Sequence, residues 1–134
     1  MIQCKRVHEA RTADDGYRVL VDRLWPRGCR KDELRLDAWA REVAPSAELR
    51  KVFHHEAERF AEFREHYRAE LAAHPEYWMP LLDKARSGTL TLLFAARDEE
   101  RNNARVLAEF LEEELERQGP PSSPVCYAGE PSGE

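Results

Sequence analysis

The sequence predicts a small single-domain α/β fold, with a mostly parallel sheet and helices packed around it in a three-layer, α/β/α-like arrangement. Two apolar runs, at residues 17–24 and 89–95, are nearly continuous, which is typical of strands covered on both faces. The long stretch between them has mainly helical periodicity. This strand–helix–strand order is that of α/β proteins, and a right-handed crossover is expected if the two strands are parallel.

The chain length predicts one domain. Its 134 residues suffice for a single hydrophobic core. We place the α/β domain at residues 1–118 and a loose tail at residues 119–134, because the tail is rich in proline, serine and glycine. Within the tail, residues 125–127 are apolar enough to dock as a short edge strand.

The N-terminal part predicts two strands. Residues 2–7 have a weak strand pattern and residues 17–24 a strong one, with the turn signal Asp15-Gly16 between them. The link is short for a helical crossover, so the relative direction of these strands stays open. Pro26 should end the second strand because it lacks a backbone N–H.

Helical periodicity fills the rest of the domain. Helices are expected over residues 32–43, 47–53 (capped by Ser46), 56–73, 75–86 and, after the strand at 89–95, roughly 99–117 (capped by Asp98). We interpret the apolar stripe of the third helix as core rather than as a cofactor site; it consists of Phe60, Phe63, Tyr67 and Leu71.

Composition narrows the classes of partner. The formal net charge of -5 argues against broad electrostatic binding to nucleic acid, which needs many phosphate contacts. No apolar run reaches the roughly 18 residues of a membrane-spanning helix, and the N-terminus does not resemble a leader. The isolated cysteines Cys4, Cys29 and Cys126 fit reduced thiols. We therefore expect a cytoplasmic protein with no membrane association, and we do not favour nucleic acid as a partner.

Arginines follow both strong strands. Arg23, Trp25 and Arg27 point to the same side if the chain stays extended, and Arg97 ends the other strand. Because ligands bind outside the carboxyl ends of strands in open α/β sheets, these arginines would share one crevice. Guanidinium groups bind phosphate or carboxylate through paired hydrogen bonds. The sequence thus predicts a small-anion or nucleotide site, formed by Arg23, Trp25, Arg27, Arg97, Asp98 and Asn102.

Structural interpretations of the same residues stay open. The arginines would also suit ion pairs with neighbouring acids, and Asp98 a helix cap. A metal site is not predicted, because Arg59 takes the second histidine position of a His-Glu-x-x-His pattern at His55. Cys29 follows Arg27-Gly28 in a basic setting that would lower a thiol pKa, so a thiol nucleophile is a further alternative. No cofactor is indicated.

The segment at residues 15–28, from Asp15-Gly16 through Asp22-Arg23-Leu24-Trp25-Pro26-Arg27-Gly28, resembles the signature of the YeaO-like branch of the domain-of-unknown-function family 488. The similarity extends over roughly residues 1–117, through 44–46, 48–50, Phe53 with His55, 62–63 with Tyr67, and 92–102. The resemblance implies a small bacterial cytoplasmic α/β protein, in a family without a settled biochemical role.

This chain departs from the family pattern at one position. The YeaO-like pattern often reads Asn-His where this chain has Asn102-Asn103, and more distant relatives have a Cys-His-Arg motif near this place. The departure removes a candidate general base or ligand. It therefore counts against chemistry that depends on a histidine here.

Three functional hypotheses remain. The first is a domain that binds a small anion or nucleotide, extended to an enzyme on a phosphorylated or carboxylated metabolite with Asp22 or Asp98 orienting the substrate or acting as base. The second is a non-catalytic interaction or regulatory module for protein or nucleic acid. The third is a thiol enzyme using Cys29. A concave pocket lined by arginines favours the first, and a flat surface with exposed Trp25 or Trp39 favours the second.

Overall fold

The computed structural model describes residues 1–53 and 57–118. Its strands are β1 (Ile2–Arg6), β2 (Tyr17–Leu20), β3 (Ala38–Trp39) and β4 (Leu90–Phe94). Its α-helices are α1 (Lys31–Leu34), α2 (Ala47–Phe53), α3 (Phe60–Ala73), α4 (Pro75–Ser87) and α5 (Asn103–Gln118). Short 3-10 turns occur at η1 (Ala13–Asp15), η2 (Arg41–Val43) and η3 (Ala57–Arg59).

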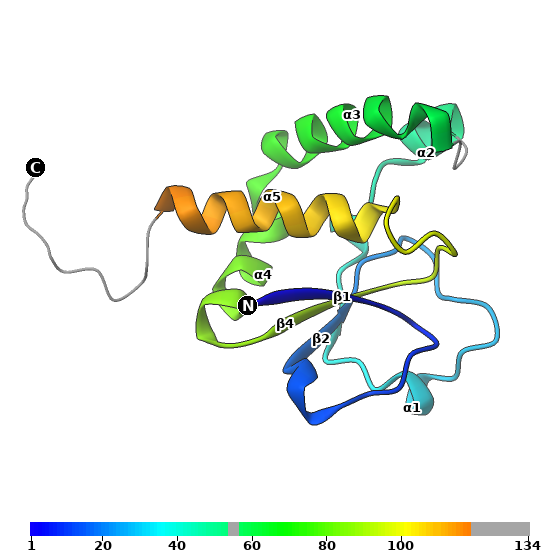
Figure 1. Cartoon of the computed structure of the whole chain (residues 1–134), viewed down its shortest axis with the longest axis vertical. Coiled ribbons are helices and arrows are strands. Elements are labelled where there is room, and N and C mark those ends of the chain that lie inside the picture. Colours follow the sequence, from blue (N-terminus) through cyan, green and yellow to red (C-terminus); the bar gives the residue numbers. More distant parts are fainter. Residues whose placement is uncertain (54–56, 119–134) are drawn as a thin grey trace, which may run out of the picture.

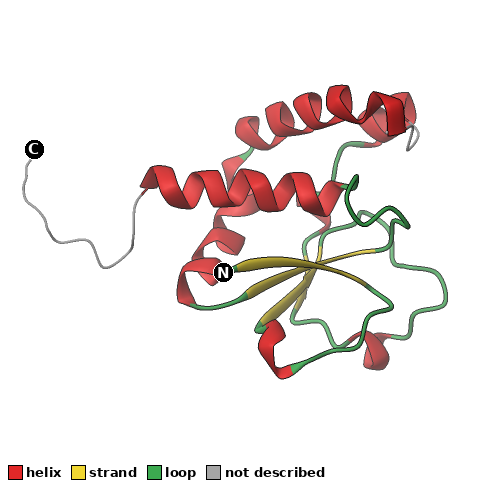
Figure 2. Ribbon diagram, in the orientation of Figure 1, coloured by secondary structure: helices red, strands yellow, loops and turns green. Residues whose placement is uncertain are grey.

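All strand pairs in the sheet are parallel, in the order β1-β4-β2-β3 (Figure 2). In the central part, Leu92 of β4 lies between Cys4 of β1 and Val19 of β2. The arrangement confirms the predicted α/β class. It also settles the direction of the first two strands, which are parallel to each other but separated by β4.

The two faces of the sheet are covered unequally. Helices α4 and α5 pack on one face over the main hydrophobic core, and α3 packs on α5 and α4 (Figure 1). The other face holds a small cluster of Val7, Leu20, Leu34 and Leu93, which the single turn of α1 and the adjoining loop cover. The second outer layer is therefore mostly loop.

The prediction of one helix over residues 32–43 is wrong: this segment contains α1, β3 and η2. Helix α1 ends at Leu34, because Arg35 adopts a left-handed conformation with φ 50°. The Asp37 N–H then donates to the Arg18 carbonyl at 2.7 Å, and the Asp37 carboxylate accepts from the Arg18 N–H at 2.8 Å. These bonds align Ala38–Trp39 beside β2, so tertiary pairing overrides the helical spacing of the apolar residues.

The other helices form close to where the sequence places them. The Ser46 hydroxyl accepts from the Leu49 N–H at 3.1 Å and caps α2 as expected, and α4 begins at Pro75. Helix α3 begins at Phe60 rather than residue 56; residues 54–56 are not among those described. Helix α5 begins at Asn103, four residues later than expected, and β2 ends at Leu20 instead of residue 24.

A buried charge cluster joins three elements. Asp15 is 1% exposed and Arg18 is 2% exposed. The Asp15 carboxylate pairs with Arg18 and, at 2.9 Å, with Lys5 of β1. The Arg18 guanidinium also donates to the carbonyls of Leu34 at 2.8 Å and Arg35 at 3.1 Å. The cluster thus links η1, β1 and β2 to the segment that leads into β3.

No helix in the described parts of the chain is long and apolar enough to cross a membrane. The cytoplasmic location stays a prediction. The proposed tail at 119–134, with its edge strand at 125–127, lies outside the described residues, so the domain boundary also stays a prediction.

Candidate functional site

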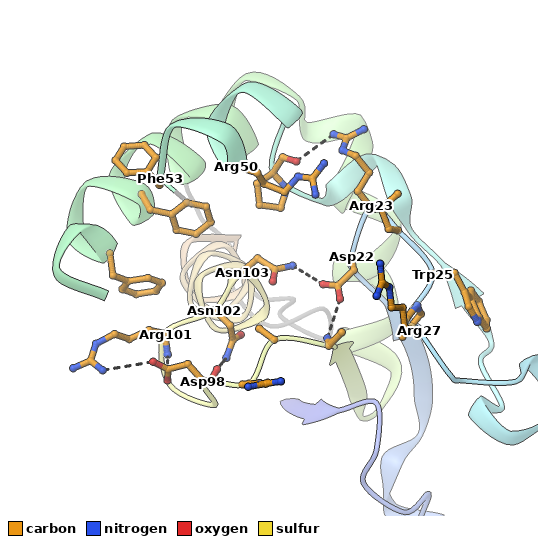
Figure 3. Close-up of a pocket in the computed structure, with 18 residues that line it drawn as sticks. Asp22, Arg23, Trp25, Arg27, Arg50, Phe53, Asp98, Arg101, Asn102 and Asn103 are labelled. Atoms are coloured by element: carbon orange, nitrogen blue, oxygen red, sulfur yellow. Dashed lines mark hydrogen bonds and ion pairs between the residues drawn. The ribbon is translucent and has the colours of Figure 1, made fainter. Parts of the chain in front are cut away.

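A pocket of about 640 Å³ lies at the carboxyl ends of β2 and β4 (Figure 3). The chain leaves β2 toward the face covered by α1, whereas it leaves β4 toward the face covered by α5. Neighbouring strands whose connections diverge in this way form the switch point at which α/β sheets bind ligands. The volume lies within the range of about 300–1,000 Å³ that is usual for small-molecule sites.

All six residues of the predicted site line this one pocket: Arg23, Trp25, Arg27, Arg97, Asp98 and Asn102. The structure therefore brings together residues as far apart in the sequence as Arg23 and Asn102, because the carboxyl ends of the strands meet at one edge of the sheet. The structure places these six residues around one pocket. That they bind an anion stays a prediction.

Trp25 contributes mainly to the packing beside the pocket. Its indole N–H donates to the Cys29 carbonyl at 2.8 Å. Its ring packs edge-on against Trp39, with 5.3 Å between centroids, and Figure 3 shows it at the margin of the lining side chains. Both rings belong to the cluster on the loop-covered face, so neither forms a flat exposed platform.

Two arginines bring buried donors to the pocket. Arg23 donates from Nη2 to the Pro45 carbonyl at 3.2 Å. The Nε atoms of Arg23 and Arg50 are buried and have no hydrogen-bond partner among the described residues. An unpaired buried donor costs about 1–3 kcal/mol, and more when it is charged. Arg6 Nε, which lies outside the pocket, is a third atom of this kind among the described residues.

Asp22 forms the floor between the two strand ends. Its Oδ2 accepts from the Ala95 N–H at 2.8 Å, and its Oδ1 accepts from Asn103 Nδ2 at 3.1 Å. Asn103 Nδ2 also donates to the Val21 carbonyl at 3.2 Å. Asp22 thus fixes the end of β2 to the end of β4 and to the first residue of α5, which makes it a positioning residue.

Asp98 and Asn102 shape the loop between β4 and α5. Asp98 Oδ1 accepts from the N–H groups of Arg101 at 2.9 Å and Glu100 at 3.0 Å, and these bonds lower the pKa of Asp98. Asn102 Oδ1 accepts from the Arg105 N–H at 2.9 Å, and Asn102 Nδ2 donates to the Asp98 carbonyl at 2.8 Å. Asn102 rather than Asp98 is therefore the N-cap of α5.

Sequence reasoning missed an aromatic wall on the opposite side. Phe53 of α2 and Phe60 and Phe63 of α3 line the pocket. Ring centroids are 6.2 Å apart for Phe53 and Phe63, and 5.8 Å apart for Phe60 and Phe63. Tyr67 and Leu71 are buried in the core as expected. Phe60 and Phe63 pack against the same core, but they are half-buried and also line the pocket.

Arg50 and Arg101 are further lining residues that the sequence did not single out. Arg50 lies in α2, far along the chain from either strand end, and Arg101 pairs with Asp98 at 3.6 Å. The only local signal was the position of Arg50 one turn before Phe53, on the same side of a short helix.

Comparison with known proteins identifies the family. The family model described as the inactive DUF488-N3 subclade matches residues 1–128. The chain belongs to this subclade. It is 53% identical to a protein of Escherichia coli named uncharacterized protein YeaO, over 110 residues that cover 82% of this chain and 96% of the relative. This likeness confirms the resemblance to the YeaO-like branch.

Mycobacterial relatives are similar over the same extent. Uncharacterized proteins of Mycobacterium bovis and Mycobacterium tuberculosis are 44% identical over 111 residues, which cover 82% of this chain and 92% of each relative. No solved structure matches the chain significantly.

In this DUF488 chain, Asn103 stands where the resemblance implies a histidine. The Asn103 amide donates to Asp22 and to the Val21 carbonyl, so here the position supports the floor of the pocket. An amide does not titrate at physiological pH, unlike the imidazole that it replaces.

Neither described cysteine of this DUF488 chain lines the pocket. Cys29 packs in the cluster on the loop-covered face. The Cys4 thiol donates to the Ala104 carbonyl at 3.5 Å, and burial raises its pKa to about 11. Within residues 1–53 and 57–118, no group of three or more histidine, cysteine or acidic residues could hold a metal ion. The sequence His54-His55-Glu56 lies outside the described residues.

Proposed function

We propose that the pocket binds a small organic anion reversibly and performs no chemistry on it. The observation that carries this proposal is the concave pocket at the carboxyl ends of β2 and β4, in which the arginines converge. Five arginines and two aspartates line the pocket, so its electrostatic potential favours a negative ligand. The first turn of α5 adds the positive end of a helix dipole, because Asn102 and Asn103 also belong to the lining.

Binding is favoured over catalysis because both carboxylates of the lining are engaged by the chain. Asp22 accepts hydrogen bonds from Ala95 and Asn103, and Asp98 accepts from its own turn. A general base needs an oxygen directed at a substrate proton. The family description, an inactive subclade, is in keeping with a binding role.

The concave shape also separates this proposal from a flat docking surface. Trp25 and Trp39, the aromatic residues that a flat interface would expose, are half-buried against each other. The arginines instead surround a cavity of a size that suits a small molecule. The geometry supports a small ligand better than a macromolecular partner.

A thermal-shift screen followed by isothermal titration calorimetry tests the proposal. The panel contains inorganic phosphate, sulfate, acetate, benzoate and adenosine monophosphate. We expect at least one anion to raise the melting temperature, because a ligand at 100 times its Kd stabilises the folded state by about 2.7 kcal/mol. Mass spectrometry of the recovered ligand should show it unchanged after incubation with the protein.

Arginine variants locate the binding. The shift should disappear in Arg23→Gln and Arg50→Gln but persist in Arg11→Gln, a matched change at an exposed position outside the pocket. Circular dichroism checks that each variant is folded. The proposal is wrong if no anion in the panel stabilises the protein, or if the stabilisation is the same in both pocket variants as in the wild type.

A further inference from the structure

The pocket has two chemically different sides. Figure 3 shows Arg23 and Arg27 to the right and Phe53 to the left, with Arg50 between them; Arg101 and Asp98 also lie on the left, below Phe53. The remaining aromatic lining comes from the start of α3. A ligand that contacts both sides must combine a charged group with an apolar body.

The apolar part of the lining consists of three neighbouring aromatic rings. The three phenylalanines Phe53, Phe60 and Phe63 have centroid separations of 5.8 and 6.2 Å, in tilted and edge-on arrangements. Aromatic rings prefer such offset and edge-to-face neighbours, and each pair contributes beyond the area that it buries. An aromatic ligand would extend this cluster, whereas a sugar would place hydroxyl groups against it without hydrogen-bond partners.

The charged side matches one small anionic group. Arg23 and Arg50 both line the pocket, and guanidinium groups donate paired hydrogen bonds to the two oxygens of a carboxylate. Arg23 is already oriented by its bond to the Pro45 carbonyl.

We infer that the ligand class is an aromatic carboxylate of one or two rings, with its carboxylate at Arg23 and Arg50 and its ring against Phe53, Phe60 and Phe63. This inference rests on the proposed function and narrows it. Inorganic phosphate would use only the arginines and leave the phenylalanines in water. A nucleotide would need partners for its sugar and base, which the phenylalanine wall does not supply.

The test compares matched probes by isothermal titration calorimetry on the full-length protein. The reference is 2-naphthoate. Its saturated analogue, decahydro-2-naphthoate, keeps the charge and removes the aromatic character. Its neutral amide, 2-naphthamide, keeps the rings and removes the charge. We expect 2-naphthoate to bind about three- to tenfold more tightly than the saturated acid, and at least about tenfold more tightly than the amide.

Variants assign each contribution to its side of the pocket. Phe60→Leu and Phe63→Leu keep an apolar side chain, so they should remove the advantage of 2-naphthoate over the saturated acid and leave the binding of the saturated acid almost unchanged. Arg50→Gln should weaken both acids and leave the amide unaffected. Tyr77→Leu is the control, because Tyr77 is exposed and stacks on His74 outside this pocket.

The outcomes separate this inference from the proposed function. If the saturated acid or inorganic phosphate binds as tightly as 2-naphthoate and Arg50→Gln weakens it, the anion site stands and the aromatic inference is overturned. Tighter binding of adenosine monophosphate than of 2-naphthoate, with the same dependence on Arg50, also overturns the inference in favour of a nucleotide. If 2-naphthoate binds equally to wild type and Arg50→Gln, or if no probe binds, both proposals fail.

Discussion

Replacing Asp15 by asparagine should destabilise the protein strongly, because Asp15 neutralises the buried Arg18. The carboxylate accepts five hydrogen bonds, whose donors are Gln3 Nε2, Lys5 Nζ, the Thr12 N–H, the Thr12 hydroxyl and Arg18 Nη1. Asparagine keeps the shape, but it removes the charge and turns an NH₂ group toward donors. Arg18, which is 2% exposed, would then be buried without its counter-charge.

The expected loss is about 3–5 kcal/mol, the usual cost of removing one partner from a buried ion pair. Domains of this size have a free energy of unfolding of about 5–15 kcal/mol, so the change is a large part of the total. At about 3–5 °C per kcal/mol, an interpolation between smaller and larger domains, the melting temperature should fall by roughly 10–20 °C.

The pH dependence has a defined sign. Burial alone would raise the pKa of Asp15, but the bonds from Lys5, Thr12 and Arg18 outweigh it and hold the pKa below its ordinary value. A depressed folded-state pKa contributes stability that is complete above the unfolded pKa, about 4, and declines as the pH falls below it. The wild type and Asp15→Asn should therefore differ most at neutral pH and converge in acid.

Urea unfolding followed by circular dichroism, at pH 7 and pH 3, measures these differences. Asp14→Asn makes the same chemical change at the adjacent, exposed position and should leave the free energy of unfolding within about 0.5 kcal/mol of wild type. A loss below about 1 kcal/mol for Asp15→Asn at pH 7, with an unchanged urea slope, would refute the reasoning that this pair stabilises the fold.

Two further predictions concern the cap of α5 and the buried thiol. Asn102→Ala should lower the free energy of unfolding by about 1–2 kcal/mol, because it removes the cap bond to the Arg105 N–H and leaves the Asp98 carbonyl without its donor; urea unfolding measures the loss, and an unchanged midpoint would contradict it. Cys4 should alkylate slowly at pH 7 and faster as the pH approaches its pKa of about 11. Mass spectrometry of iodoacetamide labelling in a Cys29→Ser, Cys126→Ser background measures this rate, and a pH-independent rate between pH 7 and 10 would contradict the raised pKa.

The strands could be predicted because their signal is local. The run at 90–94 is apolar throughout and is buried throughout, and Ser46 and Pro75 mark helix starts by chemistry that acts within one turn. The failure at 32–43 has a nonlocal cause. The Asp37–Arg18 bonds that align β3 join residues 19 positions apart, and helical spacing carries no information about them.

The same distinction between local and nonlocal causes applies to the residues of the candidate site. Arg23 and Arg97 follow strands, so the rule for carboxyl ends of parallel strands sufficed to bring them together. Arg50, Phe60 and Phe63 reach the pocket through the packing of α2 on α3 and of α3 on α5. Amphipathic spacing looks the same for a residue that faces the core and for one that faces a pocket. Asn102 and Asp98 were located correctly in sequence, but only the bonds to Arg105, Glu100 and Arg101 reveal which one caps the helix.

The position of Asp22 has a consequence for how this protein can diverge. One carboxylate holds the end of β4 and the start of α5, so the same two bonds that complete the fold also fix the floor of the pocket. A site fixed in advance requires little ordering when a ligand arrives. Substitutions at Asp22 would alter stability and ligand preference together, whereas Arg50 and Phe63 can change the preference with less effect on the fold. Ligand specificity among related chains is therefore expected to vary through α2 and α3, around a floor that stays the same.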